Sequence, residues 1–183
     1  MKFTNKNIIL DTDPNLRKKS ALVEFPLSNE DLQTLIGLRQ YVMNSIDEDM
    51  CEKYDLSPAV GIAAPQVGVM KRMCVVFIES EDGNNFDLSM INPRIMSHST
   101  TTLYIENGEA CLSIKDEHIG NIHRPNYIKV RYQDLNGNFL IIELDDFPSI
   151  AVQHEIDHLN GILYYDHISL ENPLNVPKNS HPL

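Results

Sequence analysis

The five residues His-Glu-Ile-Asp-His at 154–158 constrain the fold more than any other part of the sequence. In an α-helix, residues four positions apart lie on one face, so His154 and His158 can bind one metal ion while Glu155 reaches a water molecule beside it. The pattern therefore predicts a metal-binding helix. The alternative is a solvated helix face that carries a structural glutamate and two ordinary histidines.

The residues around this motif also favour a helix. Asp146 is followed by Pro148, which is typical of a first helical turn, and apolar residues continue through Ile150 and Val152. Asn160-Gly161 is a typical helix end. We expect one helix from Asp146 to this stop.

An N-terminal amphipathic helix is predicted to begin near Ser28, because a Ser-x-x-Asp pattern ending at Asp31 can cap its first turn. Its apolar residues recur with the helical period and should pack against the rest of the protein. They are Leu32, Leu35, Ile36, Val42, Met43 and Ile46.

Strands are predicted at Cys74–Ile78, at Thr101–Ile105, and in two segments that flank Asn136-Gly137, where a hairpin turn is expected. The two flanking segments are 128–132 and 139–144. Helices and strands do not alternate as regular βαβ units. We therefore expect an α+β fold in which mixed or antiparallel sheets pack around the metal-binding helix.

The chain has 183 residues and a formal net charge of −11 at pH 7. This length predicts a single domain over residues 1–183, whose last part, about 172–183, contains three prolines and should be irregular. The negative charge disfavours nucleic acid as a partner. No apolar run approaches the roughly 20 residues of a membrane span, and no signal peptide is evident, so we expect a cytoplasmic protein without a membrane contact.

A catalytic metal site needs a third protein ligand. The extension common in proteases, H-E-x-x-H-x-x-G-x-x-H, is followed as far as Gly161, but Tyr164 stands where its third histidine would be. Glu171 is the only glutamate after the motif, and it lies in the proline-rich tail, which is a poor place for a rigid ligand.

Cys111 is the remaining candidate for the third ligand, in the segment Glu-Ala-Cys-Leu-Ser at 109–113. One thiolate and two imidazoles would leave one coordination position for water, and this donor set suits Zn(II) or Fe(II) better than Mg(II). Taken alone, a cysteine such as Cys111 is more often a buried structural residue, as Cys74 is expected to be within its apolar run.

A third segment, Gly-Ile-Ala-Ala-Pro-Gln-Val-Gly at 61–68, combines small residues with Gln66. Small residues let the backbone approach a ligand closely, and a glutamine amide can donate a hydrogen bond to an oxyanion. Runs of Gly and Ala also serve tight packing or turns.

Together, and in this order, the three segments resemble the signature motifs of peptide deformylases, the bacterial and organellar enzymes that remove the N-formyl group from nascent polypeptides. The chain looks most like the subclass common in Gram-positive bacteria. The resemblance implies metal ligands, a general acid/base, and two donors to the oxyanion, of which the second is a backbone N–H. The implied metal ligands are Cys111, His154 and His158, and the implied general acid/base is Glu155. The implied oxyanion donors are the Gln66 side chain and the Leu112 backbone N–H.

The resemblance also implies one divalent metal ion, Fe(II) in the cell, with Ni, Co or Zn in purified protein. The substrates implied are N-formylmethionyl peptides, which are converted to formate and a free N-terminal methionine. Residues expected to bind the substrate lie next to the motifs: Val60, Gly61, Ala110, Ile150 and Ala151.

The chain departs from the family pattern at Ala59 and Ala110, where glycine is common. A methyl group at each position would narrow the peptide cleft without removing a reacting group. The tail lacks the basic amphipathic helix with which some family members dock on the ribosome, so proximity to the ribosome would be transient. A monomer is expected.

Two other kinds of protein remain possible from the residues alone. A metalloendopeptidase would use the same metal chemistry on internal peptide bonds, but the third histidine of the protease pattern is missing. A structural or metal-sensing protein would close the coordination shell, whereas three ligands beside a glutamate and a glutamine donor leave it open.

Overall fold

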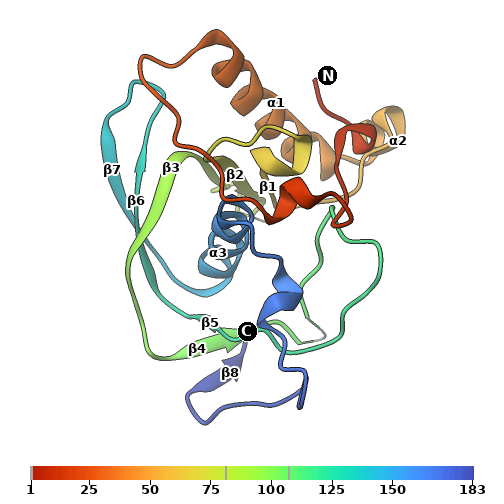
Figure 1. Ribbon diagram of the computed structural model, residues 1–183, viewed down its shortest axis with the longest axis vertical. Coiled ribbons are helices and arrows are strands. Elements are labelled where there is room, and N and C mark those ends of the chain that lie inside the picture. Colours follow the sequence, from red (N-terminus) through yellow and green to blue (C-terminus); the bar gives the residue numbers. More distant parts are fainter. Residues whose placement is uncertain (1, 81, 107) are drawn as a thin grey trace.

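The computed structural model describes residues 2–80, 82–106 and 108–183 and has an α+β fold, as predicted (Figure 1). Its described α-helices are α1 (Asn29–Ser45), α2 (Glu48–Tyr54) and α3 (Asp146–Asn160). Helix α3 lies near the centre of the molecule and contacts strands of both sheets (Figure 1).

The larger sheet is antiparallel, with strand order β1-β2-β3-β6-β7. Its strands are β1 (Gly61–Ala63), β2 (Met73–Ile78), β3 (Phe86–His98), β6 (Ile128–Gln133) and β7 (Phe139–Leu144). The smaller sheet has the order β5-β4-β8, and its β4–β8 pair is parallel. Its strands are β4 (Thr102–Tyr104), β5 (Arg124–Pro125) and β8 (Ser180–Pro182).

Helix α1 begins where the capping pattern placed it, because the Ser28 hydroxyl accepts a hydrogen bond from the Asp31 backbone N–H at 3.1 Å. Its buried apolar residues are Leu35, Leu38, Tyr41 and Val42, which pack against β1 and β2. Two residues of the expected apolar set differ: Ile36 is 40% exposed and Ile46 is 36% exposed. Ile36 lies on the exposed face of α1, and Ile46 is the cap residue that follows its last turn.

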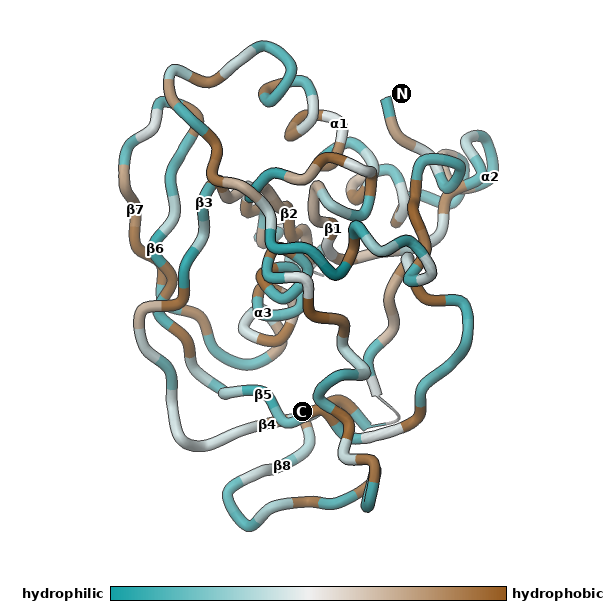
Figure 2. Tube along the Cα trace, viewed as in Figure 1, coloured by the Kyte–Doolittle hydropathy of each residue, from teal (hydrophilic) through white to brown (hydrophobic). Residues whose placement is uncertain are grey.

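Helix α3 buries Val152, Ile156 and Leu159 against the larger sheet, in a cluster that includes the fully buried Cys74 of β2. The helix ends at Gly161, whose φ of 76° lies in the left-handed region where glycine is favoured. Start and end both agree with the sequence prediction. Figure 2 shows the hydrophobic colouring gathered along β1 and β2 behind this helix, whereas α2 is mostly hydrophilic.

The predicted hairpin is formed by β6 and β7, in a register that pairs Ile128 with Leu144. The turn contains Gly137, with a φ of 83°. The expected strands at 74–78 and 101–105 are present as β2 and β4 with slightly different ends. The sheet order leaves β7 at one edge and β1 at the other.

Five helices and strands were not predicted, namely α2, β1, the long strand β3, β5 and β8. Strand β3 contains Pro93 and has two register shifts, one between Ile91 and Arg94, around Pro93, and one between Ile95 and Ser97. It therefore shows neither the apolar run nor the strict alternation expected of a strand. The expectation of an irregular segment over 172–183 is wrong for Ser180–Pro182, because β8 pairs with β4. Within the described ranges, we find no helix with the length and apolar composition required to cross a bilayer.

Candidate active site

The three expected ligands come together although they lie far apart in the sequence. The ligand atoms of Cys111, His154 and His158 are all within 4.8 Å of one another. Cys111 Sγ lies 3.3 Å from His158 Nε2, and the two imidazole centroids are 5.0 Å apart on successive turns of α3. One thiolate and two imidazoles around a common point are a donor set that fits Fe(II) or Zn(II).

His154 is held from behind by Glu109, whose Oε2 lies 2.8 Å from His154 Nδ1. The ionised carboxylate accepts the Nδ1 proton, so Nε2 is left free to face the ligand cluster. Burial raises the pKa of Glu109, but the charges and hydrogen bonds of Arg124 and His154 outweigh this effect and lower the pKa to about 2. Glu109 therefore stays ionised and orients the imidazole ring.

Arg124 connects this carboxylate to a second one on α3. Its Nε and Nη2 donate to Glu109 at 2.5 and 2.9 Å, and its Nη1 donates to Asp157 at 2.8 Å. Asp157 also lies 2.8 Å from His167 Nε2. The side chains of Arg124 and Glu109 are only 4% and 5% exposed, so this buried pair joins the Cys111 segment to the helix that carries the histidines.

Glu155 lies on the pocket side of α3 and is 4% exposed. A Cβ atom at Gly61 would lie 2.5 Å from Glu155 Oε1, so the backbone of β1 can approach this carboxyl only because residue 61 is glycine. Burial raises the pKa of Glu155 to about 7, although the charges of His154 and Arg124 oppose the shift. No partner for Glu155 Oε2 exists among the side chains and backbone groups of the described residues.

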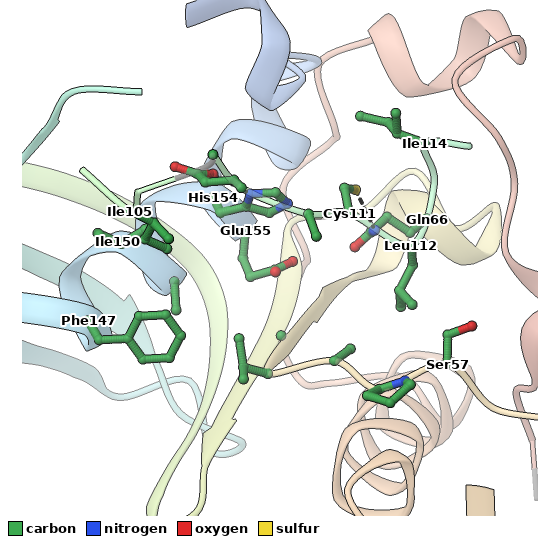
Figure 3. A pocket seen from close by; sticks show the side chains of 18 of the residues that line it. Ser57, Gln66, Ile105, Cys111, Leu112, Ile114, Phe147, Ile150, His154 and Glu155 are labelled. Carbon is green, nitrogen blue, oxygen red and sulfur yellow. Dashed lines mark hydrogen bonds and ion pairs between the residues drawn. The ribbon is translucent and has the colours of Figure 1, made fainter. Parts of the chain in front are cut away.

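Gln66 lies in the 3₁₀ turn Ala64–Val67 that follows β1. Its Oε1 accepts a hydrogen bond from the Ala63 N–H at 2.8 Å, which orients the side-chain amide. Its Nε2 then lies 3.6 Å from Cys111 Sγ and 3.3 Å from Ser113 Oγ. The amide donor therefore faces the ligand cluster, and Figure 3 shows Gln66 beside Cys111 on one side of Glu155.

A pocket of about 550 Å³ opens in front of these groups (Figure 3). All five residues expected to bind substrate line it, together with Cys111, Leu112, His154, Glu155 and Gln66. His158, the third expected ligand, is buried and is not among the lining residues. The sequence did not indicate several further lining residues, and the large apolar ones among them are Ile46, Ile105, Ile114 and Phe147.

The rejected ligand positions lie outside the cluster. The Tyr164 ring stacks on His154 at a centroid distance of 6.3 Å, and its hydroxyl accepts from the His118 N–H at 3.4 Å. Glu171 is exposed in the tail. Sequence reasoning missed the roles of Arg124, Asp157 and Glu109, because no local pattern indicates that residues 15 and 33 positions from Arg124 pair with it.

The sequence matches the model of the polypeptide deformylase family over residues 5–173. Peptide deformylase 2 of Bacillus cereus is 43% identical over 181 residues, which cover 99% of this chain and 98% of that protein. The peptide deformylase of Ligilactobacillus salivarius is 45% identical over 181 residues, or 97% of each chain. The curated relatives are mostly Gram-positive, as the resemblance to that subclass predicted.

Solved structures are similar as well. A probable peptide deformylase from synechococcus phage S-SSM7 superimposes with a TM-score of 0.69 at 34% identity, covering 88% of this chain and 98% of that one. The class I type b peptide deformylase of Acinetobacter baumannii, bound to Met-Ala-Ser, gives a TM-score of 0.68 at 30% identity over 88% of this chain and 96% of that one. The chain belongs to the polypeptide deformylase family, whose members are metal-dependent hydrolases that remove the N-formyl group from newly made polypeptides.

Proposed function

We propose that this chain deformylates N-formylmethionyl peptides with Cys111, His154 and His158 as the ligands of one divalent metal ion. The observation that carries the proposal is the convergence of the three ligand atoms within 4.8 Å at the back of a pocket that Glu155 and Gln66 also line. The donor set favours Fe(II) in the cell, with Ni, Co or Zn able to replace it. When bound, such an ion acts as a Lewis acid that makes a water molecule acidic near neutral pH.

Glu155 is the general base and general acid in this proposal. Its carboxylate is buried in the helix turn between the two histidines and lines the pocket, so it can accept a proton from the attacking water. The same carboxyl can then deliver that proton to the departing amine of methionine. The contact with Gly61 restricts where this side chain can lie, so both transfers occur from one position.

Gln66 and the backbone N–H of Leu112 stabilise the negative charge that develops on the formyl oxygen. Gln66 suits this role because its Oε1 is already held by the Ala63 N–H, which leaves Nε2 as a preoriented donor. Leu112 directly follows Cys111 and lines the same pocket. A preoriented donor requires no rearrangement when the charge appears.

The pocket suits a methionyl side chain. Its walls beside the ligands are apolar, and we assign Val60, Ile150 and Ala151 to contact the methionine, with Gly61 and Ala110 beside the peptide backbone. The products are formate and a peptide with a free N-terminal methionine. The Met-Ala-Ser bound to the Acinetobacter baumannii enzyme is a peptide of this product class.

The enzyme is proposed to act as a single-domain monomer over residues 1–183. Its substrate is a nascent chain, so it should work where translation occurs, which in bacteria is the cytoplasm. Its contact with the ribosome is proposed to be transient. No direct contact with nucleic acid or membrane is proposed.

The decisive test uses protein purified without oxygen and loaded with Fe(II). We expect formate release from formyl-Met-Ala-Ser, far slower turnover of acetyl-Met-Ala-Ser, and no digestion of casein. Acetyl carries one more methyl group, for which a site closed by the metal and the oxyanion donors has little room. Comparable kcat/KM for the two peptides would contradict the proposal, and casein cleavage would favour an endopeptidase.

A further inference from the structure

We infer that the C-terminal residues 173–183, called here the strap, position the loop that carries Cys111. This Cys111 loop comprises residues 108–123, between β4 and β5. The inference rests on the proposed function, because the strap would act on the reaction only through the roles assigned to Cys111 and Glu109.

The strap binds the end of the Cys111 loop. Asn121 donates its backbone N–H to Pro173 O at 2.8 Å and its side-chain Nδ2 to Leu174 O at 3.1 Å. His123 is bound through both ring nitrogens, since Nε2 lies 2.7 Å from Asn175 O and Nδ1 lies 2.7 Å from Ser180 Oγ. Two residues of the loop are therefore held by four hydrogen bonds to the strap.

The same strap binds the strand that leads into the loop. β8 pairs with β4 in parallel, the Thr102 N–H donates to Asn179 O at 2.9 Å, and the Leu183 N–H donates to Tyr104 O at 3.0 Å. Ile105, directly after β4, lines the substrate pocket. The strap thus connects both ends of the loop, and β4 and β8 lie side by side in Figure 1.

The two arms of the loop approach each other next to Asn121, which the strap binds. A Cβ atom at Gly108 would lie 3.2 Å from Gly120 O, so the two arms of the loop are in contact there. Gly120 in turn packs against Ile168, where a Cβ atom would lie 2.4 Å from Ile168 Cγ2. This neck leads directly to Glu109, which holds the metal ligand His154.

The strap contributes little to the hydrophobic core. Its apolar residues Leu174, Val176 and Leu183 are 61%, 47% and 55% exposed. Hydrogen bonds, and not burial, hold it in place, so its removal should loosen the Cys111 loop much more than the two hydrophobic clusters around the larger sheet. This separates a positioning role from a general stabilising role.

The test compares the wild-type enzyme with a chain that ends at residue 172 and with the double variant Asn179→Ala/Ser180→Ala. The double variant removes the Asn179 Nδ2 bond to Thr100 O (2.6 Å) and the Ser180 bond to His123, and leaves the loop sequence intact. Lys178→Ala is the matched control, because Lys178 is an exposed strap residue. Each protein is studied without metal and loaded with Co(II), which gives a thiolate charge-transfer band.

We expect hydrogen exchange of residues 108–123 to accelerate in the truncated metal-free protein while exchange in α3 stays near the wild-type rate. With Co(II), the charge-transfer band should weaken or shift, and kcat should fall about 10- to 100-fold with a smaller change in KM, since misplacement of about 1 Å can cost this much. The double variant should show the same changes in weaker form, and Lys178→Ala should show none.

Wild-type exchange, spectrum and kcat in the truncated enzyme would overturn the inference. Should the truncated chain fail to fold, the double variant decides: loop exchange equal to that of Lys178→Ala would overturn the inference, and faster exchange confined to the loop would support it. A wild-type protein that releases no formate would instead contradict the proposed function, while the exchange measurement on metal-free protein would still report on the strap.

Discussion

Helix α3 and the Cys111 loop carry the proposed ligands of one metal site, yet they are held in place by different forces. The helix positions His154 and His158 through its regular geometry and through the burial of Val152, Ile156 and Leu159 against the sheet. The loop has no helix or strand in residues 108–123 and relies on directed polar contacts, above all the buried pair of Glu109 and Arg124.

This difference implies different tolerances. A helix anchored by apolar contacts distributes its stability over many small interactions, so a single exposed polar change on it alters the fold little. A loop anchored by a few buried polar groups loses much when one partner is removed, because the remaining charge stays buried without compensation. The predictions below test this difference, from the largest expected effect to the smallest.

Glu155→Gln should impair the reaction while leaving the structure of helix α3 intact. The substitution keeps the shape of the side chain and does not touch the ligands, so metal content and unfolding should stay near wild type while kcat falls roughly 10²- to 10⁴-fold. Metal analysis and steady-state kinetics check this result. Glu117→Gln, on the exposed part of the Cys111 loop, is the control and should keep its activity. A Glu155→Gln enzyme with near wild-type kcat would refute the acid/base role.

Arg124→Met should instead lower the stability of the protein through the Cys111 loop. It leaves the carboxylates of Glu109 and Asp157 buried without their cation, which should lower the free energy of unfolding by about 3–5 kcal/mol in urea titrations. Adding Glu109→Gln should restore part of the loss, because one buried charge is removed. Lys129→Met breaks the exposed pair with Glu143 and should change stability little. Equal effects of the two single substitutions would contradict the proposed difference between the regions.

Gln66→Leu tests a group that lies between the helix and the loop. It removes one oxyanion donor, so kcat should fall about 10²- to 10³-fold while the ionising groups of the site remain. The pH profile of the residual activity should therefore resemble wild type, unlike that of Glu155→Gln, which should lose the limb that reports proton transfer. A Gln66→Leu profile that lacks this limb would show that Gln66 acts through Glu155.

The half-exposed ion pair of Asp31 and Lys71 should stabilise the fold less than the buried pair of Glu109 and Arg124 does. Burial raises the pKa of Asp31, but hydrogen bonds from Lys71 and Ser28 outweigh this effect and leave the pKa below its usual value. Ionised Asp31 therefore stabilises the fold above the unfolded-state pKa of about 3.9, and this stabilisation is lost as the pH falls through the folded-state pKa.

Metal-free Asp31→Asn should accordingly be about 1 kcal/mol less stable than metal-free wild type at pH 6, which is the usual size for such a pair. The difference should shrink as the pH falls below about 4. Urea titrations of both proteins across this range check the prediction, and a constant difference at all pH values would contradict it.

The same contrast explains what the sequence could predict. α3, its two histidines and its glycine stop follow from local periodicity and capping, as does the hairpin turn at Gly137. Cys111 and Gln66 could be selected only through their motifs, and the structure brings both beside the histidines. Arg124 carries no local pattern, because its importance depends on partners brought near by the tertiary fold. Strand β8 could not be predicted for a similar reason, since its partner β4 is far away in the sequence.

The contact between Gly61 and Glu155 also determines how protons reach the site. The backbone of β1 lies so close to Oε1 that residue 61 has no room for a Cβ atom, and Glu155, which is only 4% exposed, lines the pocket. We therefore expect its proton to exchange with bulk solvent through the pocket. Under the proposed function, a bound peptide would close that route, and a proton that Glu155 takes from water would be retained until the departing amine accepts it.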